Sequence, residues 1–197
     1  MKSLIKIIFI MCLALPFASF SDETSKPLSG RVLGNIDAKI IIEEYASMSC
    51  GHCASFHNND LKAIKKEFID KGTAKLIFYD FPLDRGAMIA SMITQCMNDD
   101  QFFPVLSRLF KKQAEWTRSD DIMKTISSIL IPLGLEESTI LSCLEETPQN
   151  QERWKSLLAG RKHAIDIKGV EATPTFFVNG NKVEGKFNLK NLKKTLK

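Results

Sequence analysis

The sequence has few prolines and glycines, little tryptophan or tyrosine, and no series of long apolar segments. Its 197 residues include 7 prolines, 10 glycines, 2 tryptophans and 2 tyrosines. This composition excludes collagen-like and proline-rich low-complexity chains. The lack of repeated long apolar segments excludes a protein that crosses a membrane many times. With 44% hydrophobic and 25% charged residues, the chain has the composition of an ordinary globular protein.

Positive charge is only slightly in excess over negative charge. The formal net charge is +4, which is too small to indicate a nucleic-acid partner. Basic stretches such as residues 190–197 are interpreted as a solvated helix face. The length is typical of one domain, or of one domain that carries a large insertion.

The first 21 residues have the layout of a secretory signal peptide. Two lysines precede an apolar run from Ile7 to Leu15, and small residues follow it. A single membrane anchor is the alternative, but the run is short against the span of about 20 residues, and Pro16 breaks it. We therefore expect residues 1–21 to direct export to a compartment in which disulfides persist.

Two predicted strands flank a predicted helix in the first part of the exported chain. A polar N-terminal tail is predicted over residues 22–38. Short apolar runs rich in β-branched residues predict strands from Lys39 to Tyr45 and from Ala74 to Pro82. The apolar residues between them recur at helical spacing, and the segment ends in Lys71-Gly72, which is typical of a helix stop. The order strand, helix, strand predicts a right-handed parallel crossover.

A long helical stretch then separates these elements from a second β region. Residues 83–165 have helical periodicity throughout, and strand character returns at Thr175 to Val178. Asn179-Gly180 after this strand predicts a hairpin turn. We therefore predict an α/β domain made of residues 39–82 and 166–197, interrupted by an all-helical domain.

Cysteine spacing points to redox chemistry. Of the five cysteines, Cys12 lies in the apolar run of the signal peptide, and the four others allow three pairings. Cys50 and Cys53 can close a small disulfide ring where the first strand runs into the helix. The backbone N–H groups of a helix N-terminus stabilise a thiolate, and Cys-X-X-Cys thiols there ionise about one to five pH units below the usual value near 8.5. His52 can add a hydrogen bond or a partial positive charge.

Other uses of the Cys50 and Cys53 pair fit less well. A structural disulfide between such near neighbours closes a very small loop and gains little entropy. A zinc site needs two further ligands at similar spacing. Haem attachment needs a histidine directly after the second cysteine, where Ala54 stands. We therefore expect no metal, and no cofactor other than a redox-active disulfide.

Three further positions are candidates for the site or its surroundings. Glu44 lies near the end of the first strand, six residues before Cys50, and a buried carboxylate there would have a raised pKa and could exchange protons with Cys53. An ordinary exposed glutamate is the alternative. Thr173-Pro174 precedes a strand, where a proline can be cis. His57 and His163 are interpreted as surface or packing residues, and Met48, Met88, Met92 and Met97 as core residues rather than an adaptable binding surface.

Together, Glu44, the run Cys50-Gly51-His52-Cys53 and Thr173-Pro174 resemble the DsbA-like thiol:disulfide oxidoreductases of the bacterial periplasm. The resemblance covers nearly all of the exported chain and implies a thioredoxin-like fold with an inserted helical domain. It implies that Cys50 is the nucleophile, that Cys53 resolves, that Thr173 and a cis Pro174 contact the substrate backbone, and that Glu44 assists proton transfer. Gly51 replaces the proline most familiar in the dipeptide, and threonine rather than valine precedes Pro174; both positions tune the thiolate.

The resemblance also carries expectations about partners and about the second cysteine pair. It implies a monomer that oxidises unfolded secreted polypeptides in the periplasm and is reoxidised by a DsbB-like membrane quinone reductase. Cys96 and Cys143 are expected to form a structural disulfide, as in some relatives; the alternative is two buried free thiols. A disulfide isomerase or reductase of the same fold remains an alternative, although only the tail before Lys39 could serve for dimerisation. A non-enzymatic secreted binding domain is another.

Overall fold

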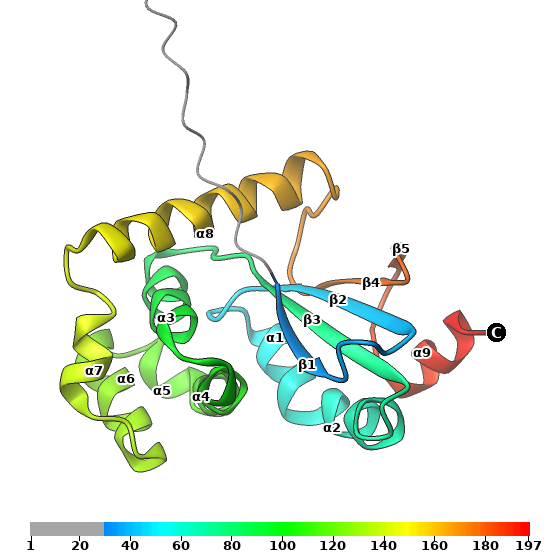
Figure 1. Ribbon diagram of the computed structural model, residues 1–197, viewed down its shortest axis with the longest axis horizontal. Coiled ribbons are helices and arrows are strands. Elements are labelled where there is room, and N and C mark those ends of the chain that lie inside the picture. Colours follow the sequence, from blue (N-terminus) through cyan, green and yellow to red (C-terminus); the bar gives the residue numbers. More distant parts are fainter. Residues whose placement is uncertain (1–29) are drawn as a thin grey trace, which may run out of the picture.

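The computed structural model describes residues 30–197; the predicted signal peptide, residues 1–21, lies outside the described residues. A five-stranded sheet with the strand order β1-β3-β2-β4-β5 organises the chain (Figure 1). The strands are β1 (Arg31–Gly34), β2 (Ile40–Ala46), β3 (Ala74–Asp80), β4 (Thr175–Val178) and β5 (Asn181–Val183).

The centre of the sheet is a parallel pair. β2 runs parallel to β3, with Glu44 opposite Phe78, while the other strand pairs are antiparallel. The chain crosses from β2 to β3 through α1 (Gly51–Ser55), α2 (Leu61–Ile64) and two intervening π-helical segments, Phe56–Asp60 and Lys65–Ile69. The predicted parallel crossover is therefore confirmed.

The predicted polar tail over residues 22–38 is wrong for residues 31–34, which form β1. This strand lies at the edge of the sheet and pairs antiparallel with β3. Its four residues are too few to show a strand pattern of their own, so pairing with β3 defines it. The Arg31 guanidinium also donates a hydrogen bond of 3.0 Å to the carbonyl oxygen of Met97 and lies 4.5 Å over the Phe102 ring. These contacts tie β1 to the helical region.

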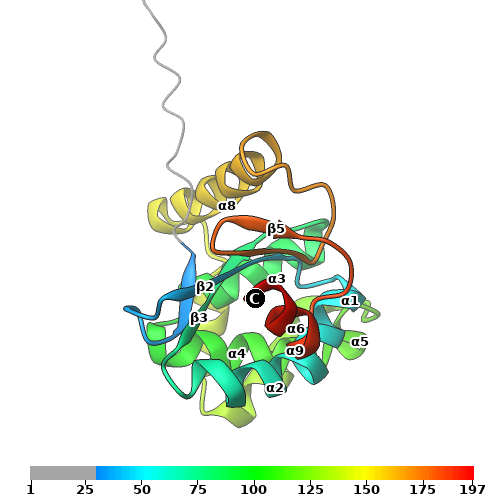
Figure 2. The same cartoon turned by 90° about the vertical axis from the view of Figure 1, so that its right-hand side faces the viewer.

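Helices cover both faces of the sheet. α8 (Pro148–Asp166) lies along one face, and α1, α2 and α9 (Leu189–Thr195) lie on the other (Figures 1 and 2). Side chains alternate along β2, so that Ile42 packs in the cluster on the α2 and α9 face, whereas Tyr45 packs in the cluster on the α8 face. The Asn179-Gly180 turn between β4 and β5 has positive φ at both residues, as predicted for a two-residue hairpin.

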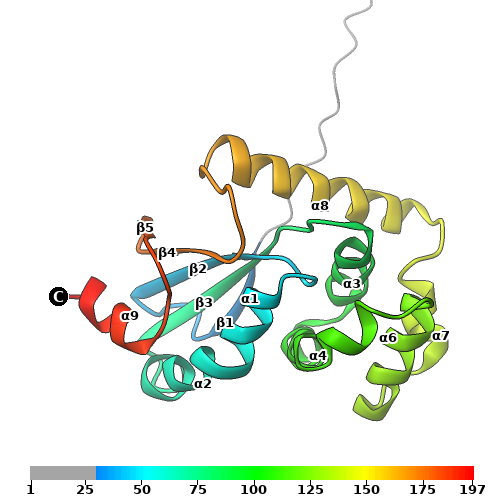
Figure 3. The same ribbon diagram turned by 180° about the vertical axis from the view of Figure 1, so that it is seen from behind.

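The helices between β3 and α8 form a separate group beside the sheet (Figure 3). Several of these helices, and α8 itself, begin at a side chain that accepts a hydrogen bond from a first-turn backbone N–H: Asp84, Asn98, Asp121 and Thr147. Before α8, the bounds are α3 (Arg85–Cys96), α4 (Asp99–Lys111), α5 (Gln113–Trp116), α6 (Ile122–Leu130), a 3-10 turn (Ile131–Leu133) and α7 (Glu137–Ser142).

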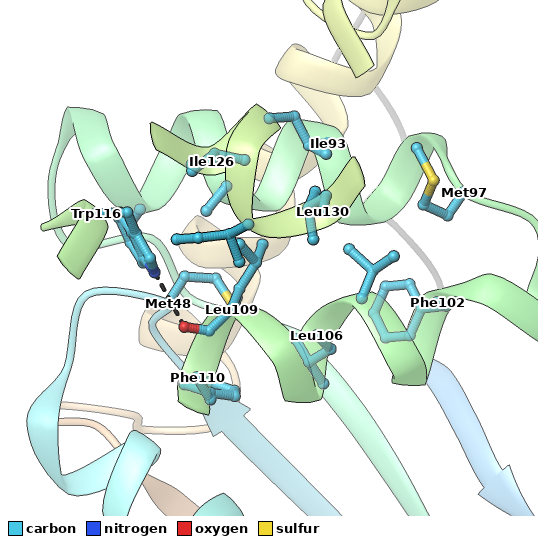
Figure 4. Packing of buried hydrophobic residues seen from close by; sticks show 14 of the residues in the cluster. Met48, Ile93, Met97, Phe102, Leu106, Leu109, Phe110, Trp116, Ile126 and Leu130 are labelled. Atoms are coloured by element: carbon cyan, nitrogen blue, oxygen red, sulfur yellow. Dashed lines mark hydrogen bonds between the residues drawn. The ribbon is translucent and has the colours of Figure 1, made fainter. Parts of the chain in front are cut away.

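One apolar core joins these helices to the start of α1. Leu106, Leu109, Trp116 and Leu130 meet in its centre, and the Trp116 indole N–H donates 3.0 Å to the carbonyl oxygen of Leu109 (Figure 4). Cys53 belongs to the same cluster. The four methionines Met48, Met88, Met92 and Met97 are buried. Their interpretation as core residues is therefore confirmed.

The α/β architecture with an inserted helical region, predicted from the sequence, is confirmed. In the part of the chain that the structure describes, no helix is both long and apolar enough to cross a membrane.

Candidate functional site

Cys50 occupies the residue that precedes the first turn of α1. Its backbone is extended, with φ −77° and ψ 121°, and no side chain caps the helix. The first turn contains no acidic residue. The backbone N–H groups of this turn are therefore available to the Cys50 sulfur. Cys50 is partly exposed, whereas Cys53 is fully buried, and both are thiols here rather than a disulfide.

The surroundings of Cys50 favour its thiolate. A hydrogen bond from the Cys53 thiol lowers the pKa of Cys50 most, and the Thr173 side chain and the backbone N–H groups of Cys53 and His52 lower it further. Partial burial opposes them, and the pKa falls to about 5. A thiol with this pKa is ionised at neutral pH and is a good leaving group in disulfide exchange.

Cys53 has the opposite tendency. Burial raises the pKa of Cys53 well above its ordinary value, and the hydrogen bond to Cys50 and the negative charge of Glu44 raise it further. The reduced pair therefore holds one thiolate, on the exposed sulfur, and one proton, on the buried sulfur.

The loop before β4 completes the exposed side of the site. The Thr173–Pro174 peptide bond is cis. The Cys50 thiol donates to the carbonyl oxygen of Thr173, with 3.2 Å between the two atoms. The Thr173 hydroxyl oxygen is buried. The loop thus brings one backbone acceptor and one buried hydroxyl to the sulfur that is exposed.

Glu44 lies under the site and is paired with His57. Glu44 is fully buried on the α1 face of β2, and His57 Nε2 lies 3.1 and 3.0 Å from its two carboxylate oxygens. Glu43 points to the other face, where its carboxylate lies 3.1 Å from the Lys168 ammonium. The alternation of the strand therefore buries Glu44, as predicted.

The interpretation of His57 as a surface or packing residue is right about its packing but misses its hydrogen bond with Glu44. Its side chain is 2% exposed and stacks on Phe110, with ring centroids 4.3 Å apart. The sequence signal was present, because His57 lies four residues after Cys53 and so one helical turn further along the same face. His163 and His52, in contrast, are exposed.

Gln113 is a second residue that the sequence did not identify. This residue begins α5 in the helical region, and its side-chain amide donates to the carbonyl oxygens of Met48 at 2.7 Å and Cys50 at 2.9 Å. A lone glutamine carries no sequence pattern that would place it here. Gln113 therefore ties the loop before α1 to the inserted helices.

The second cysteine pair lies within the helical region and is joined in the structure. The Cys96 and Cys143 sulfurs are bonded, and the Cα atoms are 5.7 Å apart. Cys96 ends α3, and Cys143 follows α7. Within residues 30–197, no group of three histidine, cysteine or acidic side chains could hold a metal ion.

Several known proteins are similar to this chain in sequence. A protein of Rickettsia bellii, whose name places it among the protein-disulfide oxidoreductases, is 27% identical over 154 residues, which cover 78% of this chain. The match spans only 58% of that relative's length. Disulfide bond formation protein D of Bacillus subtilis is 24% identical and covers 84% of this chain and 74% of its own.

The solved structures agree with these matches. Wolbachia pipientis alpha-DsbA1 superimposes with a TM-score of 0.76 at 27% identity, covering 87% of this chain and 91% of its own. The thioredoxin family model matches residues 26–197. The chain therefore belongs to the thioredoxin family and is a DsbA-like member of it.

Proposed function

We propose that this protein is a thiol:disulfide oxidoreductase that donates the Cys50–Cys53 disulfide to unfolded exported polypeptides. The observation that carries the proposal is the asymmetry of the pair. The exposed Cys50 has its pKa lowered to about 5, and the buried Cys53 has its pKa raised. A stable thiolate on one sulfur favours the reduced protein over the disulfide, so that the disulfide tends to pass to a substrate.

The proposed reaction has two exchange steps. A substrate thiolate attacks Cys50 Sγ, the Cys50–Cys53 bond breaks, and the Cys53 sulfur leaves with the electron pair and takes up a proton. A second thiolate of the same polypeptide then attacks the substrate sulfur of the mixed disulfide and releases Cys50 as a thiolate. Two electrons pass from the substrate to the enzyme, and the substrate gains one disulfide.

The proposed roles of the site residues follow their positions. Cys50 forms the mixed disulfide, and Cys53 is the sulfur that leaves when substrate attacks and that resolves the mixed disulfide in the reverse direction. The backbone N–H of His52 supports the Cys50 thiolate. Thr173 and Pro174 border the exposed sulfur and are proposed to contact the substrate backbone. Glu44 is proposed to exchange a proton with Cys53, because the negative charge of Glu44 raises the pKa of that thiol.

The proposed setting is the bacterial periplasm. A signal peptide over residues 1–21 would deliver the chain there, and a DsbB-like membrane partner would accept the two electrons of the reduced protein. The redox-active disulfide itself is proposed to carry the chemistry, without a metal or organic cofactor, in a monomer.

Three measurements test this function. The oxidised protein should introduce a disulfide into a reduced two-cysteine peptide, which mass spectrometry follows, and should restore scrambled ribonuclease only weakly. The reduction potential, measured against glutathione, should lie on the oxidising side of the glutathione couple. A potential near that of thioredoxin, about −270 mV, or strong recovery of scrambled ribonuclease, would favour a reductase or an isomerase instead.

A further inference from the structure

A buried carboxylate–imidazole pair lies behind Cys53, away from the exposed face of the site. The carboxylate of Glu44 and the ring of His57 are 0% and 2% exposed. Both carboxylate oxygens face the same ring nitrogen, Nε2. Three aromatic rings enclose the imidazole, those of Phe56, Phe78 and Phe110.

His57 also borders a groove on the surface. This groove lies between the α2 segment and α4 and is lined by Leu61, Pro104, Ser107 and the lysines Lys62, Lys65 and Lys111, together with His57 itself. None of the residues proposed to contact substrate lines it. The second ring nitrogen, Nδ1, has no hydrogen-bond partner among residues 30–197. Since the two nitrogens of an imidazole point in different directions, a ring that binds Glu44 through Nε2 presents Nδ1 elsewhere.

We propose that His57 is a positioning residue that passes protons between Glu44 and the groove, so that Cys53 gains and loses its proton while substrate covers Cys50. The inference rests on the proposed function and extends it to the route of the proton. Cys53 is fully buried, and a polypeptide bound in a mixed disulfide would cover the exposed side. A proton therefore needs a second way out.

The proton balance is simple. When the Cys50–Cys53 bond opens, the Cys53 sulfur takes one proton from the Glu44–His57 pair, and His57 recovers one from water in the groove. When Cys53 attacks the mixed disulfide in the reverse direction, the proton moves to Glu44 and leaves through His57. No electron passes through the pair.

Charged groups face the ring from several elements. Glu44 holds the ring from β2, and the thiol of Cys53 lies beyond it on α1. Lys62, Lys65 and Lys111 line the groove, and the Lys65 ammonium is paired with Asp70. The packed aromatic rings carry no charge.

The test separates the chemistry of Cys50 from that of Cys53. Reduced protein is mixed rapidly with excess oxidised glutathione between pH 5 and 9, quenched with acid, and analysed by mass spectrometry. Formation of the mixed disulfide reports attack by Cys50, and its conversion to the Cys50–Cys53 disulfide reports attack by Cys53. His57→Gln keeps a hydrogen-bond donor for Glu44 but cannot carry a proton, and His163→Gln on α8 is the matched control.

We expect His57→Gln to form the mixed disulfide at the wild-type rate and to resolve it at least about tenfold more slowly, within the usual range for loss of acid–base assistance. Resolution should also rise more steeply with pH, and added imidazole should accelerate it in His57→Ala. Unchanged rates and an unchanged pH profile in His57→Gln would overturn the inference. Failure of the wild-type protein to form any mixed disulfide at Cys50 would instead overturn the proposed function.

A measurement on the unmodified protein covers the case in which the variants do not fold. The ¹⁵N resonances of the His57 ring are compared between the oxidised and reduced forms across the same pH range. Cys53 carries a proton in the reduced form and none in the disulfide, so a ring coupled to Cys53 through Glu44 should titrate differently in the two forms. Identical ring spectra in both forms at every pH would show that His57 is not coupled to Cys53 and would overturn the inference.

Discussion

The two cysteine pairs lie at opposite kinds of helix end. Cys50 precedes the first turn of α1, where backbone N–H groups are exposed, whereas Cys96 ends α3 and Cys143 directly follows α7, where carbonyl groups are exposed. The positive end of a helix favours a thiolate and the negative end disfavours it. The end of the helix at which a cysteine lies therefore distinguishes the reactive pair from the stabilising one.

Removing the reactive sulfur should have the largest effect. Cys50→Ser eliminates the atom that accepts the substrate, so oxidation of a reduced two-cysteine peptide should fall by at least about a thousandfold, as for the loss of other enzymatic nucleophiles. The Cys96→Ser and Cys143→Ser double variant should retain the wild-type rate. If the double variant lost activity and Cys50→Ser kept it, the assignment of the two pairs would be reversed.

The same double variant should lose stability instead of activity. The Cys96–Cys143 bond closes a loop with a sequence separation of 47 residues, for which chain entropy contributes up to about 4 kcal/mol. Urea unfolding of the oxidised double variant should show a free energy of unfolding lower by up to about that amount. An unchanged unfolding midpoint would mean that this bond does not stabilise the fold.

The pH dependence of stability should also distinguish the pairs. In the reduced protein the pKa of Cys50 is about 5 when folded and near 8.5 when unfolded. Between these values the unfolded chain binds more protons, so this group makes the reduced protein more stable as the pH rises from 5 to 8.5, and the gain is lost as the pH falls through 5. The oxidised protein has no such group.

The free energy of unfolding of the reduced protein should therefore rise relative to that of the oxidised protein as the pH rises over this range. Urea unfolding of both forms at fixed pH values measures it, and the rate of alkylation of Cys50 by iodoacetamide should reach half its maximum near pH 5. Parallel stability curves together with an alkylation midpoint near pH 8.5 would show that Cys50 has an ordinary pKa.

The smallest effect is expected at Gln113, which links the loop before α1 to the inserted helices. Gln113→Ala removes two hydrogen bonds to the loop before α1, each worth about 0.5–1.5 kcal/mol. The free energy of unfolding should fall by about 1–3 kcal/mol, with a small loss in peptide oxidation. Gln151→Ala, on the exposed side of α8, is the matched control and should change neither. Equal behaviour of the two variants would leave Gln113 without a role at the site.

The resemblance favoured Glu44 as the buried one of two neighbouring glutamates. Local patterns in the sequence predicted the parallel pair, the Asn179-Gly180 turn and the opposite facing of Glu43 and Glu44. Each rests on a short-range rule: β-branched runs, positive φ at a turn, and alternation along a strand. β1 was missed because a four-residue edge strand has too short a pattern and is defined by its neighbour β3. His57 was misjudged because its partner lies on another element, 13 residues away.

The sequence by itself determined that two cysteines stand at the start of a helix after a buried strand, since neighbours along the chain set both the ring size and the helix end. Only the tertiary structure decided what surrounds the sulfurs. Gln113 from the inserted helices, Thr173 from the loop before β4 and His57 beside Glu44 reach the site through packing of distant segments. Hydrogen bonds and burial act through space over a few ångströms, so spacing along the chain can suggest the helix face on which a residue lies but not its partner.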